Sequence, residues 1–141
     1  NDNGDDGPSI EVENDRQVKK DGSNAGSSGG NFANGGVVGV KLDWSNTSSR
    51  KIEFLYDNGA MSNAGEQTFT DTSTNSGFRG HFRESGSGSI LLFNFGQNPG
   101  FFGNLSAGGN ADANSYGNFQ YSVPTGYYSI NSKNLAEYGG I

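Results

Sequence analysis

The chain has 141 residues, enough for one ordinary domain and too few for two comfortable ones. Its net charge of -6 disfavours binding to bare nucleic acid or to an anionic membrane, since both interactions depend on Lys and Arg. With no cysteine, it has neither a disulfide framework nor a thiolate metal site. The 24 Gly favour frequent turns over long helices, while 10 Phe, 6 Tyr and 1 Trp argue against disorder. No apolar run approaches the roughly 18 residues of a membrane span, and no signal peptide pattern is present.

The first 35 residues are predicted to be an acidic, Gly/Ser-rich loop region with at most one weak strand. Residues 1–8 combine Asp, Asn, Gly and Pro, which favour turns. Ile10, Val12 and Val18 provide enough apolar side chains for one strand. The stretch 19–34 is rich in Gly, Ser and Asn and offers little to bury, so it is expected to be a loop.

Two segments, 36–44 and 51–56, alternate apolar and polar residues as half-buried strands do. The apolar positions are Val38, Val40, Leu42 and Trp44 in the first, and Ile52, Phe54 and Tyr56 in the second. The loop at 45–49 has the length of a hairpin connection, so the segments are predicted to pair with Trp44 close to Ile52. Asn58-Gly59 then predicts a type I′ turn, because both residues reach a positive φ at low steric cost.

The rest of the chain predicts further short elements. Residues 66–70 and 78–84 are expected to be short strands, and the apolar run 89–95 a central strand covered on both faces. Alternation resumes in 116–123, Pro124-Thr125-Gly126 bends the chain, and residues 131–138 are long enough for one or two helical turns. The pattern is that of an all-β protein.

Several motifs occur in a characteristic order: GVVGVKLD (36–43), KIEFLYDNG (51–59) and FNFGQ (93–97), the last followed by Phe101 and Phe102. In this order they resemble the SPRY family. The Gly/Asn-rich insertion 103–117 and the stretch YSVPTGYYSINSKNL (121–135) are similar to SPRY-like domains in structural proteins of bacteriophages, marine ones above all. The aromatic-rich opening strands of the family are not found in this sequence, and residues 1–35 resemble the loop that follows those strands.

The resemblance implies a concanavalin-like, jelly-roll β-sandwich of two antiparallel sheets over residues 36–141, lacking its opening strands. It also implies a non-enzymatic virion protein, used on a tail fibre or capsid surface for host attachment or decoration. The expected partners are other virion proteins, further copies of the chain in a homo-oligomer, and a host-surface glycan. Two alternatives stay open: a self-assembling subunit of a fibre or lattice, and a lectin-like glycan-active enzyme.

Candidate chemistry is sparse. His81 is the single histidine, and its neighbours Arg79 and Arg83 suit a cationic surface stripe better than a general base. The stripe is predicted either to meet an acidic glycan or subunit, or to be a solvated strand face. No catalytic residue and no cofactor is expected.

Tyrosines are the other candidate binding residues. Tyr116, Tyr127 and Tyr128 are predicted to stack on sugar rings or to anchor an interface, with a place at the edge of the core as the alternative. A Ca²⁺ site is a minor possibility, because Asp2, Asp5 and Asp6 are closely spaced and residues 108–112 partly match a calcium-binding turn.

Overall fold

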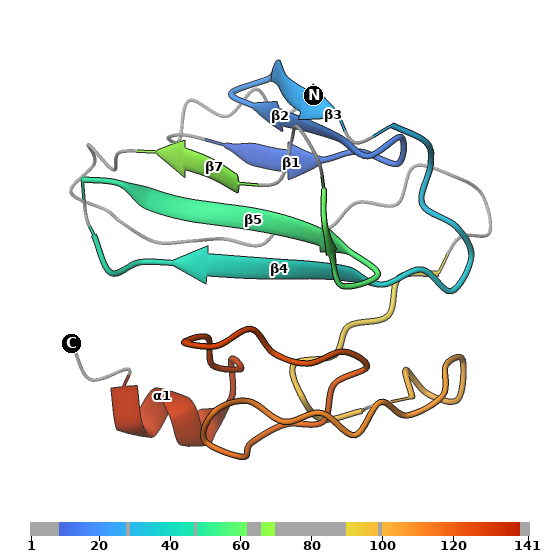
Figure 1. The fold of residues 1–141 in the computed structure, drawn as a ribbon, viewed down its shortest axis with the longest axis vertical. Coiled ribbons are helices and arrows are strands. Elements are labelled where there is room, and N and C mark those ends of the chain that lie inside the picture. Colours follow the sequence, from blue (N-terminus) through green and yellow to red (C-terminus); the bar gives the residue numbers. More distant parts are fainter. Residues whose placement is uncertain are drawn as a thin grey trace. The chain divides into compact units, whose positions relative to one another are not determined.

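The structure is a computed structural model that describes residues 9–27, 29–46, 48–61, 66–69, 90–98 and 100–138. The chain divides into two compact units, residues 1–78 and 79–141. The described strands all belong to the first, which we call the sheet unit, and the helix belongs to the second, the loop unit (Figure 1). The boundary therefore differs from the predicted one, which followed residue 35.

A three-stranded antiparallel sheet is formed by β1 (Ile10–Val12), β2 (Gln17–Lys20) and β3 (Ser23–Ser27), in that order. The prediction of at most one weak strand in residues 1–35 was therefore wrong. Asp21 and Gly22 form a two-residue loop with φ of 51° and 73°, and Lys20 pairs with Ser23 across it. Asp-Gly is a strong signal for such a type I′ hairpin. The backbone hydrogen bonds to β2 hold residues 23–27 as a strand although their side chains bury little surface.

A four-stranded sheet is formed by β4 (Val38–Asp43), β5 (Arg50–Tyr56), β6 (Gly59–Ala60) and β7 (Glu66–Phe69). The central strand β5 pairs with β4 along one edge and with β6 and β7 along the other, always antiparallel. The strands predicted at 36–44, 51–56 and 66–70 are thus confirmed. The alternation is clearest in β5, where Arg50, Ile52 and Phe54 are buried and the residues between them are half-buried, whereas Val38 and Val40 of β4 are exposed.

The turn after β5 is a hairpin, as predicted, but lies one residue earlier. Tyr56 pairs with Gly59, so the loop residues are Asp57 and Asn58, with φ of 46° and 66°. Asp57 tolerates this conformation because its carboxylate accepts the Val37 backbone N–H at 2.9 Å, while its own N–H donates to the Val37 carbonyl at 2.9 Å. The hydrogen bond from Val37, the residue before β4, to the Asp57 side chain therefore favours Asp57 and Asn58 as the two turn residues.

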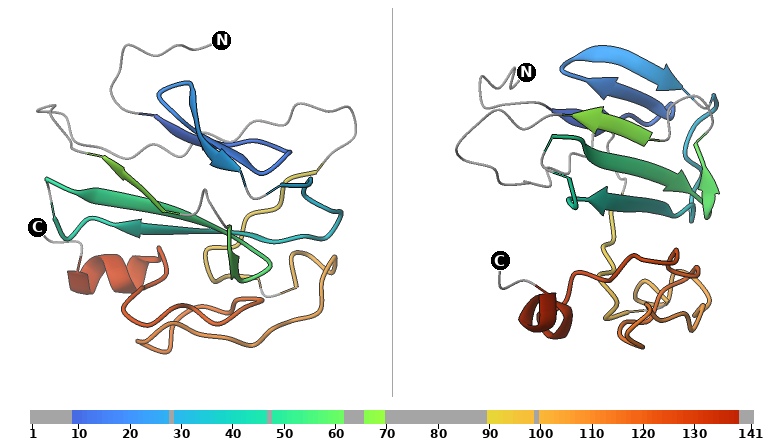
Figure 2. Two further views of the ribbon diagram at one scale, coloured as in Figure 1. Left: turned by 45° about the horizontal axis from the view of Figure 1, so that its top comes forward. Right: turned by 60° about the vertical axis from the view of Figure 1, so that its left-hand side comes forward.

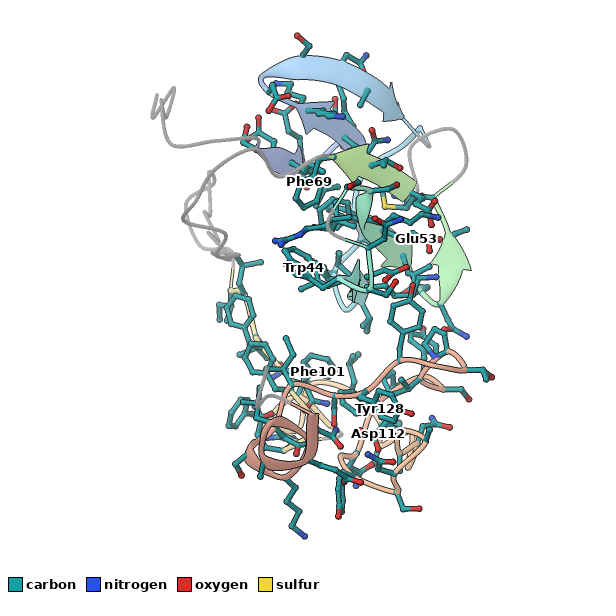
Figure 3. The ribbon with its side chains drawn as sticks, turned by 90° about the vertical axis from the view of Figure 1, so that its left-hand side faces the viewer. Trp44, Glu53, Phe69, Phe101, Asp112 and Tyr128 are labelled. Carbon is teal, nitrogen blue, oxygen red and sulfur yellow. The ribbon has the colours of Figure 1, made fainter. Side chains whose placement is uncertain are left out.

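Trp44 also differs from its predicted place. Ile52 lies opposite Leu42 rather than beside Trp44, because the β4–β5 ladder ends at the pair Asp43 and Lys51. The Trp44 ring instead meets Phe69 of β7 edge to face, with 5.7 Å between ring centroids (Figure 3). The Arg50 guanidinium lies 5.2 Å from the Trp44 ring centroid, a cation–π contact at the end of the sheet.

The two sheets share one apolar core, with the three-stranded sheet drawn in blue and the four-stranded sheet in teal and green (Figure 2). Its buried members are Val18 of β2, Ile52 and Phe54 of β5, and Met61. Burying each such side chain stabilises the fold by about 2 kcal/mol. The predicted fold class, an all-β sandwich of two antiparallel sheets, is confirmed, although its described strands lie between residues 10 and 69 rather than across 36–141.

One contact ties the turn of the β1–β2 hairpin to the other sheet. The Arg16 guanidinium lies 4.0 Å from the centroid of the Tyr56 ring in β5 and donates to the Asn31 carbonyl at 2.6 Å. Phe32 packs on the same tyrosine, with 5.3 Å between ring centroids. Together they anchor the connection between β3 and β4.

The loop unit contains one described helix, α1 (Ser132–Tyr138), and a single described bridge between Asn110 and Phe119. The helix confirms the one or two turns predicted for residues 131–138. In the described part of the chain, no helix is long and apolar enough to cross a membrane. The Tyr127 N–H donates to the Pro124 carbonyl at 3.1 Å and Gly126 has φ of 85°, which confirms the predicted bend as a type II turn.

The central strand predicted at 89–95 does not form over its described residues. Ile90 and Leu91 are 80% and 53% exposed, and no described strand pairs with them. Local side chains take the backbone groups instead: the Gln97 amide bonds the Phe95 N–H and the Phe93 carbonyl. Amide side chains of this kind compete with a strand ladder for the same partners.

The strand predicted at 116–123 is reduced to the bridge at Phe119 for a similar reason. The Asn94 amide donates to the Asn118 carbonyl at 2.9 Å, and the Asn110 amide donates to the Gln120 carbonyl at 3.0 Å. Side-chain amides thus occupy carbonyls that a neighbouring strand would use.

Candidate ligand-binding groove

Asp112 is a buried carboxylate, 7% exposed, at the centre of the loop unit (Figure 3). One of its oxygens accepts the backbone N–H groups of Asn114 and Tyr116, at 3.0 and 2.9 Å. The other accepts the Ser129 N–H at 2.9 Å, the Ser129 hydroxyl at 2.6 Å and the Asn134 amide at 2.7 Å. These five hydrogen bonds join the 112–116 turn, the segment at Ser129 and helix α1.

The hydrogen bonds decide the charge of Asp112. Burial alone raises the pKa of a carboxyl, because it disfavours the ionised form. In Asp112, donation from the Ser129 hydroxyl and N–H, then from Tyr116 and Asn134, outweighs burial and holds the pKa well below its ordinary value of 3.8. The carboxylate is ionised at neutral pH and acts as a hydrogen-bond acceptor that orders the loops.

Helix α1 is positioned by its cap and by Asp112. The Asn131 side-chain oxygen accepts the N–H groups of Lys133 and Asn134 at 3.0 and 2.9 Å, which is the N-cap arrangement. The Asn134 amide reaches Asp112 and also donates to the Ser129 carbonyl at 2.9 Å. The first turn of α1, which contains Lys133, is thus fixed by the Asn131 cap and by the bond from Asn134 to Asp112.

An open groove of about 540 Å³ lies within the loop unit. Three segments line it: Phe95, Gly96 and Gln97; Ser115, Tyr116 and Gly117; and Ile130, Asn131, Ser132 and Lys133. The apolar part comes from Phe95 and Ile130, which are 49% and 58% exposed. The lining carries hydroxyl, amide, aromatic and ammonium groups, and it carries no carboxylate side chain among the described residues.

Two glycines let the first two segments approach. A Cβ on Gly96 would lie 2.7 Å from the Gly117 Cα, closer than real Cβ atoms come to backbone. Gly96 and Gly117 also have φ of 101° and 84°, a region that side chains disfavour. Glycine is required at both positions for the segments 95–97 and 115–117 to pack this closely.

Tyr116 and Lys133 bring an aromatic ring and a cation together in the groove. The Lys133 ammonium lies 4.8 Å from the centroid of the Tyr116 ring, within cation–π range. Tyr116 is half-buried and its backbone N–H is held by Asp112, while Lys133 is exposed. A pre-positioned ring beside a cation can bind a ligand that offers an apolar face and a negative group.

Of the predicted binding residues that the structure describes, Tyr116 alone lines the groove. Tyr127 is half-buried and Tyr128 is 44% exposed, and neither lines it. The predicted cationic stripe of Arg79, His81 and Arg83 lies outside the residues that the structure describes.

Metal binding finds no support at the segment singled out for Ca²⁺. Both oxygens of Asp112 accept hydrogen bonds from N–H and O–H groups, which a cation would have to displace. Within the described ranges, no group of three or more His, Cys, Asp or Glu side chains is placed to hold a metal ion. Asp2, Asp5 and Asp6 fall outside those ranges.

The chain matches no family model, and comparisons with curated proteins and with solved structures find no match either.

Sequence reasoning missed Ser129 and Lys133, and considered Asp112 only as part of a calcium-binding turn. A usable signal was present at Asp112, because an Asp side chain in a turn commonly accepts the backbone N–H two residues on, here that of Asn114. The partners Ser129 and Asn134 lie 17 and 22 residues away, so no local pattern announces them. Only the fold of the loop unit brings them to one carboxylate.

Proposed function

We propose that this chain is a non-enzymatic binding module of a phage particle, a SPRY-like domain that contributes to host attachment or to decoration of the virion surface. The observation that carries the binding role is the groove: Tyr116 and Lys133 lie side by side in it, and the bonds of Asp112 and Asn131 hold the backbone of both. The motifs at 36–43, 51–59 and 93–97 support the SPRY-like assignment, and the stretches 103–117 and 121–135 support the phage assignment.

The chemistry of the lining supports binding over turnover. Glycosidic cleavage ordinarily uses two carboxyl groups on either side of the scissile bond. The groove offers an aromatic ring, hydroxyls and an ammonium group, which suit recognition. A shallow site binds weakly by itself, but many copies on one particle raise the avidity by about 10²- to 10⁴-fold.

A glycan array probed with the chain displayed on a tetravalent carrier tests the binding role. We expect binding to a defined set of glycans, no released sugar, and a strong loss of signal in Tyr116→Ala. Phe102→Ala is the matched control, because Phe102 is an exposed aromatic residue that does not line the groove. Failure to bind any glycan would refute the adhesion role, and release of sugar would refute the non-enzymatic one. Detection of the chain in purified virions by mass spectrometry tests the location.

A second candidate is a self-assembling subunit of a fibre or lattice. It is favoured by the exposed apolar side chains of Ile90, Leu91 and Phe95, which follow one another closely in the loop unit. Light scattering coupled to size-exclusion chromatography distinguishes the two roles. A concentration-dependent assembly that Leu91→Ser reduces would favour the subunit, and a monomer at all concentrations would exclude it.

A further inference from the structure

We propose that the groove binds a carboxylate-bearing sugar of the uronic acid class, with Lys133 binding the carboxylate and the Tyr116 ring covering a face of the sugar. This inference rests on the proposed binding function and names the class of ligand for the same groove. It follows from which lining groups are still available to a ligand.

Each of the two amides of the lining already uses its oxygen and one N–H within the chain. The Gln97 side chain bonds the Phe95 N–H and the Phe93 carbonyl, at 2.6 and 3.0 Å. The Asn131 side chain caps α1 and donates to the Ser129 hydroxyl at 2.5 Å. Planar amides and carboxylates are the groups that bind paired sugar hydroxyls, because an amide can donate and accept at once and an ionised carboxylate can accept from two hydroxyls. Among its described lining residues, the groove is therefore left with no carboxylate and no wholly available amide to select a neutral sugar.

Lys133 is the strongest donor left to a ligand. Its ammonium has three N–H groups and is exposed, and its described partner is the Tyr116 ring. The described lining holds no carboxylate that would neutralise it. A charge-assisted hydrogen bond to an anion is about twice as strong as a neutral one, so this donor favours a carboxylate over a hydroxyl.

The rest of the groove suits the body of a sugar ring. Phe95, Ile130 and the Tyr116 ring provide apolar surface for the C–H face of a pyranose. The hydroxyls of Ser115 and Ser132 line the same space and can donate to or accept from sugar hydroxyls. Asp112 holds the Tyr116 backbone in place before a ligand arrives, which lowers the entropic cost of binding.

The test compares polygalacturonate with its fully methyl-esterified form, using the full chain on a tetravalent carrier and biolayer interferometry. The two polymers share the sugar ring and differ in the charge of the carboxyl group. We expect the acid form to bind at least about tenfold more tightly, because one hydrogen bond to a charged group contributes about this factor in affinity. Added salt should weaken binding to the acid form more than to the ester.

Variants assign the effect to Lys133. Lys133→Gln should remove the preference for the acid form, and Lys133→Arg should keep it. Lys19→Gln is the matched control, since it changes the net charge equally at a lysine of the sheet unit that pairs with Glu13. Equal binding of both polymers, or an unchanged preference in Lys133→Gln, would overturn the inference.

The outcomes separate this inference from the proposed function. If the chain binds neutral glycans on the array and shows no preference for the acid polymer, the uronic acid assignment fails and the binding function stands. If it binds neither polymer and no glycan on the array, both fail.

Discussion

In the sheet unit, the N–H and C=O groups of β5 bond to β4 on one side and to β6 and β7 on the other, over a core that includes Ile52 and Phe54. In the loop unit, turns and one bridge bond part of the backbone, and side chains bond much of the rest, with Asp112 accepting from three segments. Both units are rich in Gly, Asn and Ser, so these residue types do not distinguish them. The difference shows that such a chain can be ordered either by a ladder over apolar side chains or by polar side chains that replace the ladder.

The comparison predicts where each unit is vulnerable. Asp112→Ala leaves the donors of Asn114, Tyr116, Ser129 and Asn134 without their acceptor, and we expect the loop unit to lose about 4 kcal/mol of stability. Hydrogen exchange read by mass spectrometry should show lost protection in residues 100–138 alone.

Glu137→Gln is the control for Asp112→Ala, since it removes one negative charge from an exposed position of the same unit. It should leave exchange unchanged. Equal loss of protection in β4 and β5 would contradict the separate character of the two units.

The sheet unit should respond to a cavity instead. Ile52→Ala at a position that is 3% exposed should cost about 3 kcal/mol, through lost burial and the space left behind. Denaturant unfolding followed through Trp44 fluorescence reports on this unit. Val40→Ala in β4 is the control, because Val40 is 45% exposed and should lose well under half as much. Equal effects at the two positions would contradict the core described here.

Low pH should destabilise the loop unit through protonation of Asp112. The pKa of Asp112 is lower in the folded chain than its ordinary value of 3.8, so its contribution is complete above that pH and is lost as the pH falls below it. One such proton gives a slope of about 1.4 kcal/mol per pH unit. Hydrogen exchange in residues 100–138 between pH 4 and pH 2 measures it, compared with Asp112→Ala. A slope of the same size in the variant would show that another group is responsible.

The smallest expected effect is a gain. Phe101 and Phe102 have φ of 46° and 58°, a left-handed conformation that is costly for bulky residues, and Phe102 is 69% exposed. Phe102→Gly should stabilise the loop unit by up to about 1 kcal/mol, after the greater chain entropy of glycine is deducted.

Gly103→Ala in the same turn should do the opposite. Gly103 has φ of 87° and open space around it, so the substitution tests the backbone alone. The thermal midpoint of each variant measures the change. A lower midpoint for Phe102→Gly would mean that the exposed ring contributes more than its backbone strain costs.

The sequence by itself determined the strands whose alternation and turns agree: β4, β5 and β7, the hairpin after Tyr56, and the helix at Ser132–Tyr138. Period-two patterns are local, so they can be read without knowing what lies opposite. Asp21-Gly22 also signalled the β2–β3 hairpin, but the strand after it has few apolar residues and was overlooked.

Only the tertiary structure decided the rest. Whether residues 90–95 pair as a strand depends on amides at Asn94 and Gln97 that take the same backbone groups. Asp112, Ser129 and Asn134 meet through contacts that span up to 22 residues, and Tyr116 meets Lys133 in the same way. Hydrogen bonds between distant polar residues leave no periodic trace in a sequence, because their partners are chosen by the path of the folded chain.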